Sequence, residues 1–220
     1  MRTAKATKNG SANRVKDVIA KSETVKILPL DKRKMVVTVV GETDYLSHRI
    51  CPSVTEGITA KQQGKVIEKV RLTPEEEYLS SLHVINPKKK MYGAPCSGFR
   101  LGIVGACGKD FPGNLSKIGS RGSIFIYGED CPNLCTIKKA KPFMFSHPVR
   151  IPKTGSIIER HRACFPAGWE ITMIVEYDAS VVTAEQIVNL INRAGFSFGL
   201  GDWRAQKDGV FGKYSVKATK

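Results

Sequence analysis

Residues 169–216 read WEITMIVEYDASVVTAEQIVNLINRAGFSFGLGDWRAQKDGVFGKYSV, and this stretch decides the fold. Its first nine residues, 169–177, alternate apolar with polar side chains, which predicts a strand with one buried face. Thr183 and Gln186 have the spacing of a capping box and predict a helix start. Gly195 is expected to end that helix as its left-handed cap.

A second alternating segment, 211–216, predicts a strand that closes the unit. A β-α-β unit of this kind cannot bury its strand faces and the apolar stripe of its helix alone. An equivalent half is therefore expected earlier in the chain.

The first half of the chain carries matching signals. The β-branched run 35–40 predicts a central strand buried on both faces, and Thr73-Pro74-Glu75-Glu76 predicts a helix start. Ser97 is expected to cap a second helix, and residues 123–127 predict a strand with its even-numbered residues toward the core. The order β-α-β-β-α-β predicts an α+β fold of the ferredoxin-like type, with one face of its antiparallel sheet free.

The domain organisation follows from composition. Residues 1–24 are rich in Lys, Arg, Ala, Ser and Thr and are predicted to form a flexible basic arm. Residues 25–220 are predicted to form one ferredoxin-like domain with two insertions. The first, at about 51–71, is expected to be a long basic loop with room for a short helix. The second, at about 128–166, is irregular, and a hairpin is one option.

The net charge of +15 comes from 35 Lys and Arg against 20 Asp and Glu. Charge of this size concerns partners, and it favours nucleic acid, an anionic membrane surface or an acidic protein. No run of about 18 apolar residues is present, so no membrane helix is expected, and the N-terminus lacks the apolar core of a signal peptide. Six dispersed cysteines favour a reduced, cytoplasmic setting.

The motifs of catalysis are absent from the sequence. Its four histidines form no HExxH, and no nucleophile elbow or Walker lysine loop is present. Cys131 and Cys135 are two thiols without further ligands, so incidental cysteines are favoured over a metal site. Neither a cofactor nor a metal is expected, and the sequence predicts that the protein is not an enzyme.

The basic segments suit a binding surface, because Lys and Arg neutralise phosphates and neighbouring rings stack on bases. Three groups are predicted to contact nucleic acid: Tyr45, His48 and Arg49 with Lys61 and Lys65; Arg150, Lys153, Arg160, His161 and Arg162; and Arg204, Lys207, Phe211 and Lys213. For any single lysine, a solvated surface position is the alternative. Trp203 is expected to pin its glycine-rich loop to the preceding helix by packing.

Several segments resemble a family of phage- and prophage-encoded proteins of similar length. They are 35–41 followed by His48-Arg49, 73–82, 92–95, 169–177, 184–195, 199–204 and 211–214. More distantly, the layout resembles the RRM-derived, RAMP-like backbone subunits of multi-subunit CRISPR complexes. That second resemblance implies a non-catalytic protein that coats single-stranded nucleic acid as a repeating assembly, in the cytoplasm of a bacterial host. Neither resemblance transfers a catalytic residue.

Three hypotheses follow. The leading one is a phage protein that binds single-stranded RNA or DNA as a homo-oligomer or filament, without a membrane partner. The alternative is a phage structural or counter-defence protein whose basic face meets an acidic protein. A nuclease or nucleotide-processing enzyme is the third, and it requires a clustered carboxylate or histidine site that the sequence does not reveal.

Overall fold

The computed structural model describes residues 29–65, 72–108, 115–150 and 154–217. The predicted basic arm at 1–24 and the candidate contact Lys153 lie outside these ranges. The elements, in chain order, are β1 (Lys32–Gly41), β2 (Tyr45–Leu46), α2 (Pro52–Gln62), α3 (Pro74–Ser80), β3 (Val84–Asn86), β4 (Met91–Pro95), α4 (Cys96–Gly105), α5 (Lys117–Ser123), β5 (Ile124–Gly128), β6 (Leu134–Lys138), β7 (Phe143–Arg150), β8 (Ile157–Phe165), β9 (Glu170–Asp178), α6 (Ala184–Ser197), the 3-10 turn η1 (Ala205–Lys207) and β10 (Tyr214–Val216).

Two antiparallel sheets organise these elements, so the predicted α+β class is confirmed. The larger sheet has seven strands in the order β10-β1-β9-β6-β4-β3, with β5 also paired to β9. The smaller sheet has the order β2-β8-β7. The prediction of a single sheet is therefore wrong. The insertion at 128–166 adds β6 to the main sheet, and its strands β7 and β8 form most of the second sheet.

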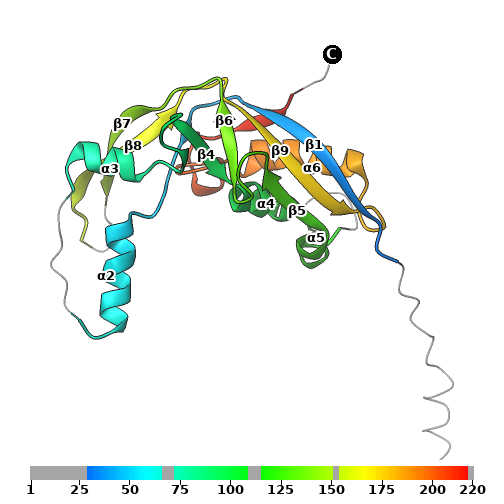
Figure 1. The fold of residues 1–220 in the computed structure, drawn as a ribbon, viewed down its shortest axis with the longest axis horizontal. Coiled ribbons are helices and arrows are strands. Elements are labelled where there is room, and N and C mark those ends of the chain that lie inside the picture. Colours follow the sequence, from blue (N-terminus) through cyan, green and yellow to red (C-terminus); the bar gives the residue numbers. More distant parts are fainter. Residues whose placement is uncertain (1–28, 66–71, 109–114, 151–153, 218–220) are drawn as a thin grey trace, which may run out of the picture.

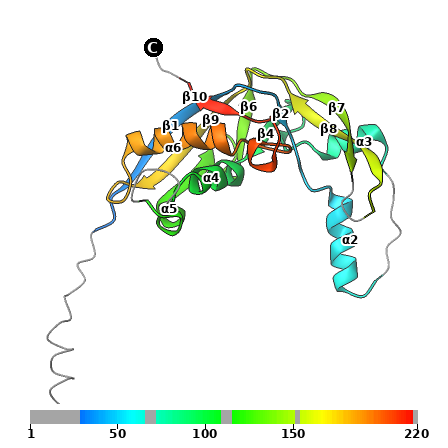
Figure 2. The ribbon, with the colours of Figure 1, turned by 180° about the vertical axis from the view of Figure 1, so that it is seen from behind.

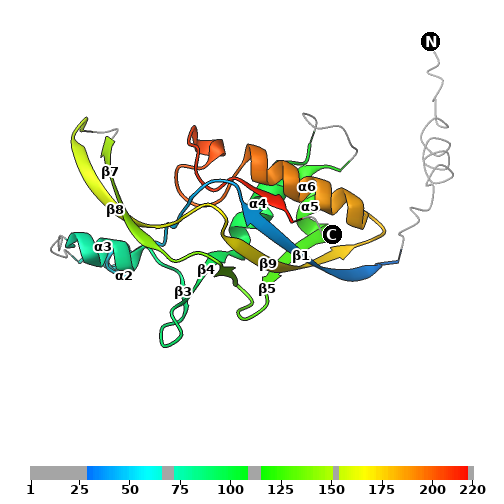
Figure 3. The same ribbon diagram turned by 90° about the horizontal axis from the view of Figure 1, so that it is seen from above.

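The helices α4 and α6 pack against each other on one face of the main sheet (Figures 1–3). The core lies between them and the sheet, where Ile171, Met173 and Val175 of β9 are fully buried. At the other end of the molecule, α3 packs against β8, and α2 extends away from the second sheet (Figure 1). None of the helices in the described part of the chain has the length and apolar character that crossing a bilayer requires.

Strand β1 is buried on one face only, which corrects the expectation of a doubly buried strand. Val37 and Val39 are buried against the helices, whereas Val36 on the opposite face is 66% exposed. A continuous β-branched run does not distinguish the two cases, because Val and Ile also suit a half-exposed sheet surface.

Helix α6 begins as predicted, with the reciprocal capping box between Thr183 and Gln186. Its predicted end is wrong, because the helix continues through Gly195 to Ser197. The left-handed residue that follows is Gly199 at φ +66°, whose N–H donates to the Ala194 carbonyl. Gly195 serves another purpose: a Cβ there would lie 1.8 Å from the carbonyl oxygen of Tyr214 in β10.

Of the remaining predictions, the alternation of β5 and the cap of α3 are confirmed, whereas the predicted starts of α4 and of the closing strand are wrong. Strand β5 has the predicted alternation, with Ile124 and Ile126 buried, and α3 has its Thr73 cap. Helix α4 is capped by Pro95 rather than Ser97, and the closing strand begins only at Tyr214. The first insertion contains the short helix α2, whose one buried residue is Ala60.

The close contact between α6 and β10 predicts that Gly195→Ala destabilises the protein. In an ordinary helix, replacing Gly by Ala stabilises by about 0.5–1 kcal/mol, but here the new methyl group would overlap backbone. We expect a loss of about 1–3 kcal/mol, the usual cost of overpacking. Urea unfolding followed by circular dichroism measures it.

Gly102→Ala in α4 is the matched control, because its Cβ would meet the Ala194 Cβ at an ordinary 3.4 Å. This variant should be neutral or more stable than the wild type. Equal unfolding midpoints for the two variants would contradict the contact described for Gly195.

Candidate functional site

The glycine-rich loop 199–212 lies against β2 and the β7–β8 hairpin, and this junction is the candidate site. Backbone hydrogen bonds fix the loop: Asp202 N donates to the Leu46 carbonyl at 2.9 Å, and Gly212 N donates to the Asp44 carbonyl at 2.7 Å. Gly201, at φ +82°, has no room for a side chain, because a Cβ would lie 2.3 Å from the Leu46 oxygen. The loop therefore has one defined position on the second sheet.

Four rings meet at this junction and form the aromatic cluster Phe145, His147, Trp203 and Phe211. The centroids of His147 and Trp203 are 4.2 Å apart, and Phe145 lies 5.6 Å from Phe211. Trp203 stacks beside Phe211 at 6.3 Å and keeps 38% of its surface exposed. Trp203 therefore packs its loop against His147 of β7 rather than against the preceding helix as expected, and the exposed part of the indole remains open to solvent.

His147 is the buried member of the cluster, at 5% exposure. Its Nδ1 has no hydrogen-bond partner among the described residues. Burial lowers the pKa of His147, and the neighbouring Arg162 lowers it further. The ring therefore packs as a neutral aromatic group.

A cluster of three polar side chains, His48, Arg162 and Asp202, ties the loop to the hairpin. His48 Nδ1 lies 3.1 Å from Asp202 Oδ2, and Arg162 Nε lies 2.9 Å from the same oxygen. The hydrogen bond with His48 and the positive charge of Arg162 together lower the pKa of Asp202 to about 2, against the opposing effect of burial. A second pair joins α3 to β8, where Arg160 donates to Glu77 Oε1 at 2.6 Å and His161 N donates to Oε2 at 3.1 Å.

The structure separates the predicted contact residues by exposure. His48, Arg49, Lys61, Lys65, Arg150 and Lys207 are exposed; Arg160, His161, Arg162, Arg204, Phe211 and Lys213 are partly buried; and Tyr45 is 1% exposed. Tyr45 is therefore corrected from a candidate contact to a core residue, because its ring packs at 5.8 Å against both Phe165 and Trp169. A buried ring offers no face to a base.

The structure brings one member of each predicted group together at the junction: His48, Arg162 and Phe211. It divides the second group, because side chains alternate across a sheet. Phe145 pairs with Arg162 and Ser146 with His161, so Arg160 and Arg162 share the face of the aromatic cluster while His161 and Arg150 share the opposite face.

The free face of the main sheet is less available than the sequence indicated. Lys32 and Lys34 pair with Glu176, and Lys139 and Lys217 pair with Glu170. Both glutamates are nearly covered, at 13% and 14% side-chain exposure. These cations are already neutralised. By contrast, no described carboxylate forms an ion pair with Arg49, Lys61, Lys65, Arg150 or Lys207.

Sequence reasoning missed the roles of Asp202, His147 and Phe145. His48 and Asp202 are 154 positions apart, so no local spacing links them. The alternation of Phe143, Phe145 and His147 was the one available signal, and the two prolines nearby obscured it. In the described ranges, no group of three His, Cys, Asp or Glu side chains could hold a metal ion.

Asp202→Asn should destabilise the protein, because it removes the charge that His48 and Arg162 share. With a third of the side chain exposed, we expect a loss of about 1–2 kcal/mol at pH 7 after allowance for solvent screening. Because the pKa of Asp202 is lower in the folded protein than in the unfolded chain, Asp202 contributes fully to the unfolding free energy above the unfolded-state pKa near 4. That contribution is lost as the pH falls through the folded-state pKa of about 2. The difference in unfolding free energy between wild type and variant should therefore shrink below pH 4.

Asp208→Asn is the control with the same charge change. Asp208 is exposed at φ +59°, a conformation that Asn also adopts. Its unfolding midpoint should match the wild type throughout the pH range, and a loss as large as that of Asp202→Asn would mean that net charge alone is responsible.

Comparison with known proteins identifies a fold and no family. No family model matches the sequence, and no curated protein matches it. The structure is similar to a chain of a solved complex, the cryo-EM structure of the Type III-B Cmr-beta bound to cognate target RNA, with a TM-score of 0.52 and 10% sequence identity. The likeness covers 95% of this chain and 65% of that chain. It supports, for the fold, the predicted resemblance to RAMP-like subunits of CRISPR complexes.

Proposed function

We propose that this protein binds single-stranded nucleic acid at the junction of the glycine-rich loop with the second sheet. The observation that carries the proposal is the Trp203 indole, which is 38% exposed on a loop that also carries Lys207, an exposed lysine with which no described carboxylate forms an ion pair. A π-face near cationic groups suits a strand whose bases stack while its phosphates are neutralised. The net charge of +15 supports the same ligand class.

The fold supports the proposal at a second level. Strands β10, β1, β9 and β5 lie side by side with α4 and α6 on one face, and we propose that they form a ferredoxin-like βαββαβ core. The Cmr-beta complex that contains a similar chain is bound to target RNA. We extend an RNA or DNA ligand to this protein as part of the proposal.

We further propose that the protein acts by binding rather than by catalysis. The His48–Asp202–Arg162 cluster has the elements of a base and its orienting carboxylate, but Asp202 shares its oxygen between both cations. This arrangement suits a clamp that holds the loop. A phage origin, a cytoplasmic setting and assembly into a repeating oligomer complete the proposal.

Trp203→Ala should weaken binding of a labelled oligonucleotide by roughly fivefold to a hundredfold, since stacking contributes about 1–3 kcal/mol per base. Fluorescence anisotropy with single-stranded RNA and DNA measures it. Tyr127→Ala is the control, because Tyr127 is 37% exposed, nearly the same as Trp203, and lies on β5 of the main sheet outside the aromatic cluster. Equal losses in the two variants, or an unchanged affinity in Trp203→Ala, would move the binding site elsewhere.

The cations predict a salt dependence that can be assigned to residues. Replacing Arg49 and Lys207 by Ala should make the slope of log affinity against log salt shallower by about 0.7 for each lost phosphate contact. Lys88→Ala with Lys89→Ala is the matched pair, because the β3–β4 turn points away from the side that carries the loop (Figure 3). The oligonucleotide should remain uncleaved during these titrations. Cleavage by the wild type that is lost in His48→Ala would overturn the proposal that the protein is not catalytic.

Assembly is tested by light scattering after size exclusion. A repeating oligomer should lengthen in proportion to the length of the added oligonucleotide. An oligomer of fixed size that ignores the oligonucleotide would instead favour the alternative of an acidic protein partner.

A further inference from the structure

Two buried cysteines, Cys96 and Cys135, lie with their sulfur atoms 3.3 Å apart. Their position follows from the ladder between β4 and β6, in which Ala94 pairs with Cys135. Cys96 comes two residues later and its N–H donates to the Asn133 carbonyl at 3.0 Å. Backbone hydrogen bonds therefore hold the two thiols together.

The other cysteines have different surroundings. Cys107 donates to the Ile103 carbonyl, Cys51 lies 3.1 Å from the Ser53 hydroxyl, and Cys164 lies 4.0 Å from Asp44. All six cysteines fall within the described ranges, and Cys96 and Cys135 are the pair whose sulfurs are in contact there. The contact is thus specific to these two positions.

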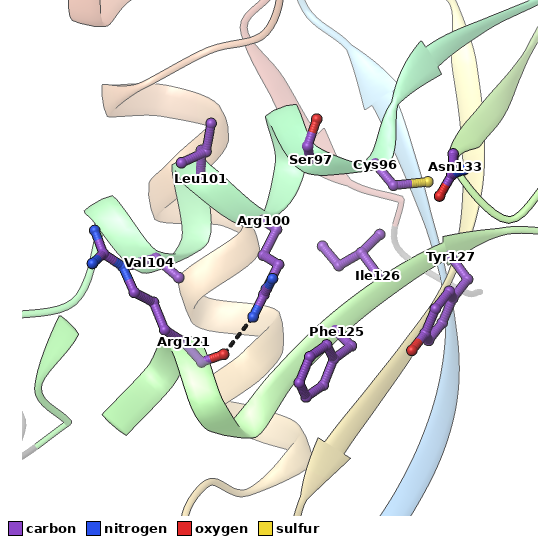
Figure 4. A pocket seen from close by; sticks show the side chains of 10 residues that line it. All are labelled: Cys96, Ser97, Arg100, Leu101, Val104, Arg121, Phe125, Ile126, Tyr127 and Asn133. Atoms are coloured by element: carbon purple, nitrogen blue, oxygen red, sulfur yellow. Dashed lines mark hydrogen bonds between the residues drawn. The ribbon is translucent and has the colours of Figure 1, made fainter. Parts of the chain in front are cut away.

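The two thiols differ in access. Cys96 lines a groove of about 580 Å³ between α4 and β5 (Figure 4), whereas Cys135 does not line this groove and is fully buried. The hydrogen bond between them lowers the pKa of Cys96, and the same contact together with burial raises the pKa of Cys135. Cys96 is also the first residue of α4, where a thiolate meets the positive end of the helix dipole.

The groove has the charge to admit a small anionic molecule. Arg100 and Arg121 line it opposite Tyr127 (Figure 4). Arg100 is fixed there, because it donates to the carbonyls of Ile124 and Arg121 and lies 4.6 Å over the Phe125 ring. Low-molecular-weight thiols and disulfides of the glutathione class carry carboxylates that such guanidinium groups bind.

We propose that Cys96 and Cys135 are a redox-active dithiol that exchanges with small anionic disulfides entering this groove. Cys96 is the attacking thiol and Cys135 the resolving thiol. The site is separate from the nucleic-acid interface and does not depend on the proposed function.

The exchange proceeds in two balanced steps. The Cys96 thiolate attacks one sulfur of the disulfide RSSR, which gives a mixed disulfide and releases RS⁻, and this takes up the proton that Cys96 lost. Cys135 then gives up its proton and attacks the Cys96 sulfur, which closes the internal disulfide and expels the second RS⁻. The two cysteines lose two electrons and two protons, and RSSR becomes two RSH.

The test exposes the full chain to glutathione buffers of rising oxidised fraction, then unfolds it in urea with N-ethylmaleimide so that buried free thiols are also blocked, and maps the peptides by mass spectrometry. Labelling at Cys96 and Cys135 should disappear together, with a cross-linked peptide in its place that dithiothreitol reverses. Labelling that persists at both positions in the oxidising buffer would show two thiols that only pack.

Two variants separate the roles. Cys135→Ser should stop at the mixed disulfide between Cys96 and glutathione, whereas Cys131→Ser should still close the internal disulfide. Cys131 is the matched control because it lies four residues from Cys135 and is only partly buried. A disulfide that needs Cys131, or a Cys135→Ser protein that folds normally by circular dichroism without modification at Cys96, would overturn the proposal.

Discussion

Strand β9 hydrogen-bonds to neighbours on both sides, and the rest of the molecule depends on this pairing. It pairs with β1 along nine residue positions from Lys32 to Val40, and with β5 and β6 on its other edge. Its alternation places Ile171, Met173 and Val175 toward the helices, so a shift of one residue would turn the apolar set toward solvent. The register of β9 therefore determines which face of the main sheet is apolar and packs against α4 and α6. It also determines where the chain passes from the main sheet to the second sheet.

The elements that could be predicted from the sequence are those whose signals are local. The capping box joins Thr183 to Gln186, three positions later. The alternation of apolar and polar side chains in β9 and in β5 is visible within each strand. What could not be predicted is where distant segments meet. The burial of Tyr45 depends on Phe165 and Trp169, more than a hundred positions later in the chain, and the need for glycine at position 195 depends on the Tyr214 carbonyl of β10, which leaves no room for a side chain there. The conformational preferences of neighbouring residues predict neither of these contacts.

The candidate site shows the same division. Composition indicates a basic protein, and the sequence shows which segments are rich in Lys and Arg. It does not show which carboxylates neutralise which of these cations. Among the described residues, Glu77 pairs with Arg160 and Asp202 with Arg162, while Glu176 pairs with Lys32 and Lys34, and Glu170 with Lys139 and Lys217. Pairing therefore distinguishes cations that hold the fold from cations that remain for a ligand, and pairing is a property of the folded chain.

Helix α2 has a consequence for the thermodynamics of any complex at its end of the molecule. It is 11 residues long, and Ala60 is its one buried residue, while Val54 and Ile58 are more than half exposed. Isolated helices shorter than about 12–15 residues are marginal in water, so its amide hydrogens should exchange with solvent sooner than those of the sheet. A ligand that requires the helical form has to order it on binding. Part of its interaction free energy is then offset by lost conformational entropy, and the measured binding entropy carries that cost.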